Sequence, residues 1–226
     1  MGKIDKLVFY DTSMRRMISN LYARMILDSR GNPTIEVDCY VGEKLAGRAA
    51  VPSGASTGSY EAVELRDNEK AWSGKGVNNA VSNINEIIRP KIIGMNLEKL
   101  KEIDEKLIEI DNSSNKSRLG ANAILGVSLA CLRATTSGQL WEYISEGNEC
   151  SLPIPLMNIL NGGAHASSNV DIQEFMIIPH GFDNFTTSLR AGVEIYHCLK
   201  LVLKEEGLII DFKVEETEKK QNLITN

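Results

Sequence analysis

Within the segment from residue 22 to residue 51, apolar and polar residues alternate with a period of two at 35–41, and this period predicts a β-strand with one buried face. The clearest alternation is carried by four apolar residues: Ile35, Val37, Cys39 and Val41. Turn-forming residues at 29–33 and 42–44 separate this strand from shorter apolar runs on either side. We therefore expect a β-meander between residues 22 and 51.

After residue 74 the apolar spacing changes to three or four residues, which predicts helices. Two such faces are visible, the first with Val77, Val81, Ile84 and Ile88, the second with Leu100, Ile103, Leu107 and Ile110. Asn96 is a suitable N-cap for the second helix. Residues 119–134 are so rich in Ala, Leu, Ile and Val that we expect a helix buried on most sides. Strands followed by a run of helices predict an α+β domain.

A second pattern begins near residue 152. Pro153 and Pro155 bracket the start of an apolar strand that runs to Leu160, and a second apolar strand is expected at 175–178. Five apolar residues then recur at helical intervals: Leu189, Val193, Tyr196, Leu199 and Leu203. Gly207 has the position of a helix C′ residue. Residues 209–226 carry mixed charges with little apolar periodicity, so we expect a frayed tail.

Composition narrows the classes of protein. The net charge of −5 argues against a nucleic-acid partner, which usually meets a basic surface. No apolar run is long enough to cross a bilayer. A secretory signal needs one continuous apolar stretch after its basic residues. In the first twenty positions the polar residues 11–13 interrupt any such stretch, so we expect a cytoplasmic protein. The four cysteines are far apart and are expected to be buried thiols in a reducing compartment.

Two segments carry candidate chemistry: Val51-Pro-Ser-Gly-Ala-Ser-Thr-Gly58, and residues 158–176 with Asn161-Gly-Gly-Ala-His165 and Gln173-Glu-Phe-Met176. The first is a small-residue loop suited to a charged ligand, and the second brings a histidine and a carboxylate to the ends of two apolar strands. Both resemble the enolases. Further blocks agree in the same order, among them Asp28-Ser-Arg-Gly-Asn-Pro-Thr34, Glu64-Leu-Arg-Asp67 and Asn115-Lys-Ser-Arg-Leu-Gly-Ala-Asn-Ala-Ile-Leu-Gly-Val-Ser128.

The resemblance implies an α+β amino-terminal domain followed by a modified β/α barrel. It also implies the dehydration of 2-phosphoglycerate to phosphoenolpyruvate in glycolysis, a carbon–oxygen lyase reaction. The proton comes from a very weak carbon acid, so the family uses two Mg²⁺ ions to stabilise the intermediate and a lysine as base. Enolases form dimers and larger rings, so a homo-oligomer is implied as well.

Four site residues follow from the resemblance. Ser56 matches the loop serine that helps ligate the second Mg²⁺, and His165 matches a histidine that approaches the substrate. Glu174 matches the carboxylate on the hydroxyl side of the substrate, and Gln173 matches a substrate-binding position. The structural alternatives are an ordinary Ser/Gly turn for Ser56, a solvent-exposed turn for His165 and a strand edge for Glu174. A buried Glu without a partner is costly, which by itself favours a site.

The chain also departs from the family. A closed barrel takes about 250 residues, and 151–226 is much shorter, so we expect an incomplete barrel. The lysine base and the acidic ligands of the first Mg²⁺ have no counterpart in this sequence. The expected division is an extension at 1–21, the α+β domain at 22–150, the first barrel elements at 151–208 and a divergent tail at 209–226. We expect a truncated enolase that is inactive alone.

Two other hypotheses stay open beside a working enolase. In the first, the chain is a non-catalytic fragment that associates with full-length enolase subunits. In the second, it is a decayed gene product with no stable fold. A different reaction of the enolase superfamily, such as racemisation or sugar-acid dehydration, fits the loop and the Gly-Gly-Ala-His segment less well.

Overall fold

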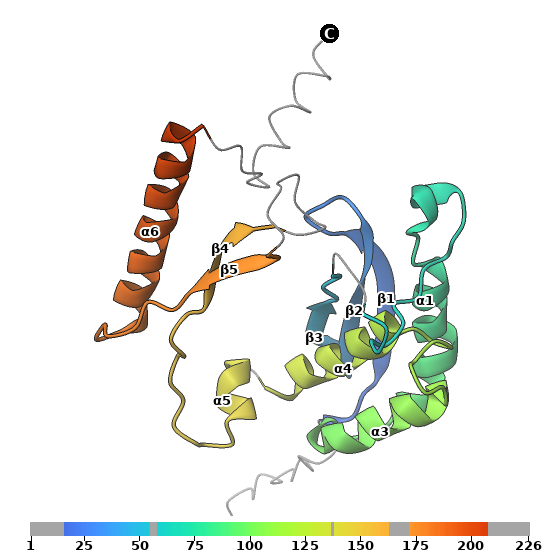
Figure 1. Cartoon of the computed structure of the whole chain (residues 1–226). Coiled ribbons are helices and arrows are strands. Elements are labelled where there is room, and N and C mark those ends of the chain that lie inside the picture. The colour runs from blue at the N-terminus through green and yellow to red at the C-terminus, as the bar shows by residue number, and fades with distance from the viewer. Residues whose placement is uncertain (1–15, 55–57, 137, 163–171, 208–226) are drawn as a thin grey trace, which may run out of the picture. The chain divides into compact units, whose positions relative to one another are not determined.

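The computed structural model describes residues 16–54, 58–136, 138–162 and 172–207. The chain divides into two compact units, Met1–Asn148 and Glu149–Asn226, whose elements are labelled in Figure 1. No helix within the described ranges is long and apolar enough to cross a membrane.

The first unit begins with a three-stranded antiparallel sheet in the order β1 (Asn20–Leu27), β2 (Pro33–Val41) and β3 (Lys44–Ala50). The predicted meander is therefore confirmed. Alternate side chains of the sheet point into one core, and the buried ones are Leu21, Ala23, Ile35, Val37, Cys39 and Ala49.

The opposite face of the sheet holds an ion-pair cluster that the period of two does not predict. Asp38 in β2 is only 1% exposed although it lies on the polar side of the strand. Arg48 donates from Nε to Asp38 Oδ1 at 2.5 Å, and Arg24 donates from Nη1 to Asp38 Oδ2 at 2.8 Å. Arg24 also donates to Glu36. The hydrogen bond from Arg48, and then that from Arg24, lowers the pKa of Asp38 to about 2.

The helix predicted from Val77, Val81, Ile84 and Ile88 is present as one continuous helical segment. It follows a short 3₁₀ turn, η2 (Ala71–Gly74). It consists of α1 (Asn78–Ser82), a π-helical stretch η3 (Asn83–Ile88) and α2 (Arg89–Ile92). Val77, Ile84 and Ile88 are fully buried. Asn85 in the π-helical stretch bonds the β1 edge twice: it accepts from Ala23 N at 2.9 Å and donates to Ala23 O at 3.0 Å.

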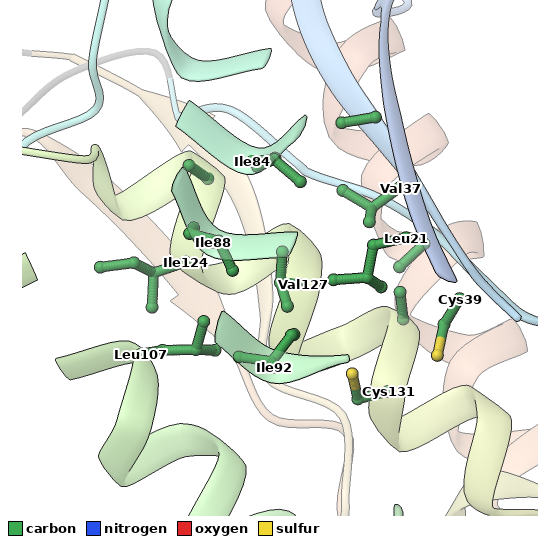
Figure 2. Packing of buried hydrophobic residues seen from close by; sticks show 14 of the residues in the cluster. Leu21, Val37, Cys39, Ile84, Ile88, Ile92, Leu107, Ile124, Val127 and Cys131 are labelled. Atoms are coloured by element: carbon green, nitrogen blue, oxygen red, sulfur yellow. The ribbon is translucent and has the colours of Figure 1, made fainter. Parts of the chain in front are cut away.

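The second helix face is formed by α3 (Leu100–Asp111), which follows the 3₁₀ turn η4 (Leu97–Lys99). Asn96 is the predicted N-cap and accepts a hydrogen bond from Glu98 N at 3.0 Å. The helix ends where Asn112 takes a left-handed conformation with φ of 52°. Leu107 points from this helix into the core (Figure 2).

The buried helix predicted at 119–134 is α4 (Ala121–Thr135), which packs against β2 and β3. Two glycines bring it close to the sheet. A Cβ on Gly47 of β3 would overlap the carbonyl oxygen of Ala130, and a Cβ on Gly126 would meet Val37 Cγ2 at 2.8 Å. The helix therefore lies nearer to the sheet than larger side chains would allow. A short helix, α5 (Leu140–Ile144), follows and buries none of its residues.

The second unit contains β4 (Met157–Asn161), β5 (Glu174–Ile177) and α6 (Phe185–Glu205). The strands are antiparallel neighbours, and β4 begins later than the prolines predicted. Asn184 caps α6 by accepting from Thr187 N at 2.9 Å, and Gly207 has the left-handed φ of 69° expected at C′. Two strands and one helix do not close a barrel, so the described part of this unit confirms the predicted incomplete β/α architecture.

Candidate functional site

The Ser/Gly loop leaves the sheet at Val51, and hydrogen bonds fix that point. Val51 N donates to Ile35 O at 2.9 Å, and Thr34 Oγ1 donates to Val51 O at 2.7 Å. Ser56, the predicted metal ligand, lies at 55–57, outside the described residues. The structure therefore shows how the loop is attached, through residues 51–54 and 58–66.

The turn between β1 and β2 is attached to the first part of the loop. The Asp28 carboxylate accepts from Asn32 N and from Arg30 N, each at 2.9 Å, and these bonds, Asn32 first, lower the pKa of Asp28. Arg30 is thereby placed beside the loop and donates from Nη2 to Ser53 O at 2.8 Å and to Gly54 O at 3.3 Å. One guanidinium thus holds two successive carbonyl groups of the loop.

A second guanidinium holds the Ser53 side chain. Arg66 donates from Nη2 to Ser53 Oγ at 3.1 Å and to Glu64 Oε1 at 2.7 Å, while Ser53 Oγ donates to Glu64 Oε2 at 3.1 Å. Through Nη1, Arg66 also donates to the carbonyl oxygens of Pro33 and Lys75, each at 2.7 Å. The Arg66 side chain is 18% exposed, so these charged bonds are partly shielded from water.

The chain after the loop is tied to the start of α4. Asn122 is buried; it donates to Leu65 O at 3.0 Å and accepts from Leu65 N at 3.1 Å. Val63 adds two backbone bonds, to Asn115 O and from Ala121 N, each at 2.8 Å. The start of the loop is therefore hydrogen-bonded to the sheet, and the chain after the loop is hydrogen-bonded to the start of α4 in the same unit.

Glu174 and Gln173 lie at the start of β5 in the second unit, and both are exposed. Glu174 is opposite Asn161 in the strand register, and Gln173 O accepts from Gly162 N at 2.9 Å. The argument from a costly buried Glu therefore does not apply to Glu174, whose exposure fits the strand-edge alternative. His165 lies within 163–171, outside the described residues. His180 and His197 are exposed.

The predicted site residues are only partly assembled. Gln173 and Glu174 lie together at one strand end, where a carboxylate and an amide are free to reach a polar ligand. No three His, Cys, Asp or Glu side chains gather into a metal-binding group in the described part of the chain. Mg²⁺ usually keeps several water ligands and takes only one or two protein carboxylates, so the described residues show no complete protein cage for that ion.

The attachment of the loop by Arg30, Ser53, Glu64 and Arg66 was not predicted. Its signal in the sequence is the pair of charged blocks, 28–34 and 64–67, on either side of the loop. The blocks carry the resemblance, but their spacing alone does not show that two guanidinium groups reach the same serine. The cysteine prediction needs a correction: Cys39 and Cys131 are buried, whereas Cys150 and Cys198 are exposed.

The structure defines a class of protein with two parts. The first is an α+β domain that carries a Ser/Gly loop, and the second begins with two strands and a helix, as a β/α barrel can. Comparison with protein families agrees with this class. Residues 18–144 match the family model described as enolase, N-terminal domain, and residues 149–216 match the model described as enolase, C-terminal TIM barrel domain. The chain belongs to the enolase family.

Proposed function

We propose that this protein carries part of the pocket that dehydrates 2-phosphoglycerate to phosphoenolpyruvate, with the site residues Ser56, His165, Gln173 and Glu174. The observation that carries the proposal is the match of both enolase domains in order, over residues 18–144 and 149–216. The attachment of the loop by two arginines supports it, because residues that meet a ligand must be held by well-packed neighbours.

Each residue has a proposed role. Glu174 assists the departure of the hydroxyl group, and its exposure leaves the carboxylate accessible to a ligand. Gln173 and His165 contact the substrate. Ser56 would supply one oxygen to a Mg²⁺ ion, and that ion would stabilise negative charge on the substrate. One serine alone does not hold such an ion, so the remaining ligands must come from outside the described residues.

We further propose that the 226 residues alone do not turn over the substrate. Removal of a proton from carbon needs a base close to that carbon, and the lysine that serves this role in the family has no counterpart in this sequence. The test is the ultraviolet absorbance of phosphoenolpyruvate formed by the purified chain with Mg²⁺ and 2-phosphoglycerate, with a complete enolase as positive control. We expect no product above the buffer rate. Sustained turnover that Glu174→Gln abolishes would contradict the proposal.

Association with complete enolase subunits is a second candidate function, favoured by the apolar surface of the second unit. Large apolar side chains there are at least a third exposed, including Ile154, Leu156, Phe175, Met176, Ile178, Leu201 and Val202. Apolar side chains that gather into one exposed patch are typical of surfaces that bind another protein.

The test is co-elution of the tagged chain with a complete enolase in size-exclusion chromatography. We expect co-elution with the parent chain and its loss in a Leu201→Lys/Val202→Lys variant. Lys101→Glu on the surface of the first unit is the matched control and is expected to co-elute. Absence of co-elution by the parent chain at micromolar concentration removes this candidate.

A further inference from the structure

Two cysteines lie in the core of the first unit, on different elements. Cys39 belongs to β2 and Cys131 to α4, and both are 0% exposed. They are 92 positions apart in the sequence. The proposed dehydration uses neither thiol.

Close packing of α4 on the sheet brings these thiols together. Gly47 is paired with Cys39 in the strand register, and the α4 backbone approaches Gly47 at Ala130, the residue before Cys131. Because Gly47 has no side chain, the helix reaches the sheet beside Cys39. Figure 2 shows the sulfur atoms of Cys39, from β2, and Cys131, from α4, in the same region of the core, and the two thiols share a hydrogen bond. A disulfide requires two Cα atoms within about 7 Å, and close helix–sheet packing favours that separation.

We infer that Cys39 and Cys131 form a latent internal disulfide, closed by a hydroperoxide, that locks α4 onto the sheet. The first thiolate attacks one peroxide oxygen, so that an S–O bond forms while the O–O bond breaks; this gives a sulfenic acid, and the leaving oxygen is protonated to an alcohol, or to water when the oxidant is hydrogen peroxide. The second thiol then attacks the sulfenic sulfur, the S–S bond forms as the S–O bond breaks, and the sulfenic oxygen leaves as water. Sulfur loses two electrons in all, and the hydroperoxide gains them.

The fold makes this reaction depend on opening of the core. A hydrogen bond with Cys39, and then burial, raises the pKa of the Cys131 thiol, so little of the reactive thiolate is present. Neither thiol is exposed to solvent. Oxidation is therefore slow in the closed unit and faster when α4 separates from the sheet. Once formed, the cross-link restricts the unfolded chain and opposes further opening.

The experiment uses the full chain with Cys150→Ser and Cys198→Ser, which removes the two exposed thiols and leaves the buried pair. The protein is treated with hydrogen peroxide, well below and then near its melting temperature, and alkylated after denaturation. Peptide mass spectrometry identifies the products, and a melting curve follows each sample. The matched controls add Cys39→Ala or Cys131→Ala to this background.

We expect a loss of two hydrogen atoms, a Cys39–Cys131 peptide, faster formation near the melting temperature and a rise in melting temperature of about 10 °C. A reductant should reverse all of these. The single-cysteine controls should instead gain oxygen and show no rise. Oxygen addition to both thiols without a cross-link, equal rates at both temperatures, a cross-link that lowers the melting temperature or no reaction at all would overturn the inference. The mass of the oxidised parent separates a cross-link from oxygen addition even where a control variant fails to fold.

Discussion

The two units of this chain use their apolar residues in opposite ways. In the first unit, a sheet, α3 and α4 enclose one continuous cluster whose members include Leu21, Val37, Ile84, Leu107 and Val127, each fully buried. In the second unit, most large apolar side chains of β5 and α6 are exposed, and the buried positions of α6 are Ser188 and Gly192. Apolar periodicity gives rise to strands and helices in both, but only a second packed layer converts them into a core.

The largest expected difference concerns the removal of leucine side chains. Leu107→Ala removes a fully buried side chain from the first unit and is expected to lower the free energy of unfolding by about 3 kcal/mol. Leu201→Ala removes a side chain that is 61% exposed and should change it by less than about 0.5 kcal/mol. Urea unfolding measures both, and equal effects would mean that the two units do not differ in this way. Absence of a cooperative transition in the parent chain would favour a decayed product.

Glycine replacements test the difference in packing. Gly47→Ala forces a Cβ against the α4 backbone at Ala130, so we expect a loss of about 2 kcal/mol. In the second unit, Gly192→Ala meets the flexible end of Met157 and also improves helix propensity, so its effect should be near zero or stabilising. Thermal melting and the helix signal in circular dichroism measure the two changes. A harmless Gly47→Ala would show that α4 is not packed closely on the sheet.

The Asp38 cluster predicts a pH dependence for the first unit. Its folded pKa is about 2 against an ordinary value of 3.8, which corresponds to about 2 kcal/mol. A lowered folded pKa contributes stability that is fully present above about pH 4 and is lost as the pH falls towards 2. The Asp38→Asn variant should therefore have a free energy of unfolding about 2 kcal/mol lower at neutral pH. It should also lack the loss of stability that protonation of the Asp38 carboxylate causes between about pH 4 and about pH 2. Urea midpoints measured from neutral pH down to about pH 2 check it, and parallel curves for the two proteins would contradict the assignment.

The smallest expected effects come from two matched helix caps. Asn96→Ala and Asn184→Ala each remove a side-chain oxygen that accepts a backbone N–H, at a cost of about 1 kcal/mol. In the first unit the loss should shift the cooperative unfolding transition. In the second it should appear as faster hydrogen exchange at the start of α6, with the main transition unchanged. A shift of that transition by Asn184→Ala would show that α6 unfolds together with the first unit.

Much of the fold could be predicted because its signals are local. The period of two defined the meander, helical spacing defined α3 and α6, the richness in Ala, Leu, Ile and Val defined α4, and Asn96 and Gly207 marked helix ends. The burial of Asp38 could not be predicted, since it depends on arginines from two neighbouring strands. The π-helical stretch at 83–88 was missed for a similar reason, because Asn85 bonds a strand more than sixty residues earlier.

The candidate site was predicted less completely than the fold, because its loop is held by hydrogen bonds between segments that are far apart in the sequence. The resemblance identified Gln173 and Glu174 as neighbours at a strand end, and the structure places them there. It did not identify Arg30 and Arg66, which hold the loop from two different segments. The sequence left both a buried and a strand-edge position open for Glu174, since burial of a strand face depends on the elements that cover it.

Native-state hydrogen exchange of the full chain tests the central claim most directly, namely that a stable loop-bearing unit precedes barrel elements that lack a covering layer. We expect the amides of β2 and α4 to exchange only through global unfolding, and those of β4, β5 and α6 to exchange through local opening at much lower free energy. Equal protection of the two units in the isolated protein would contradict the account.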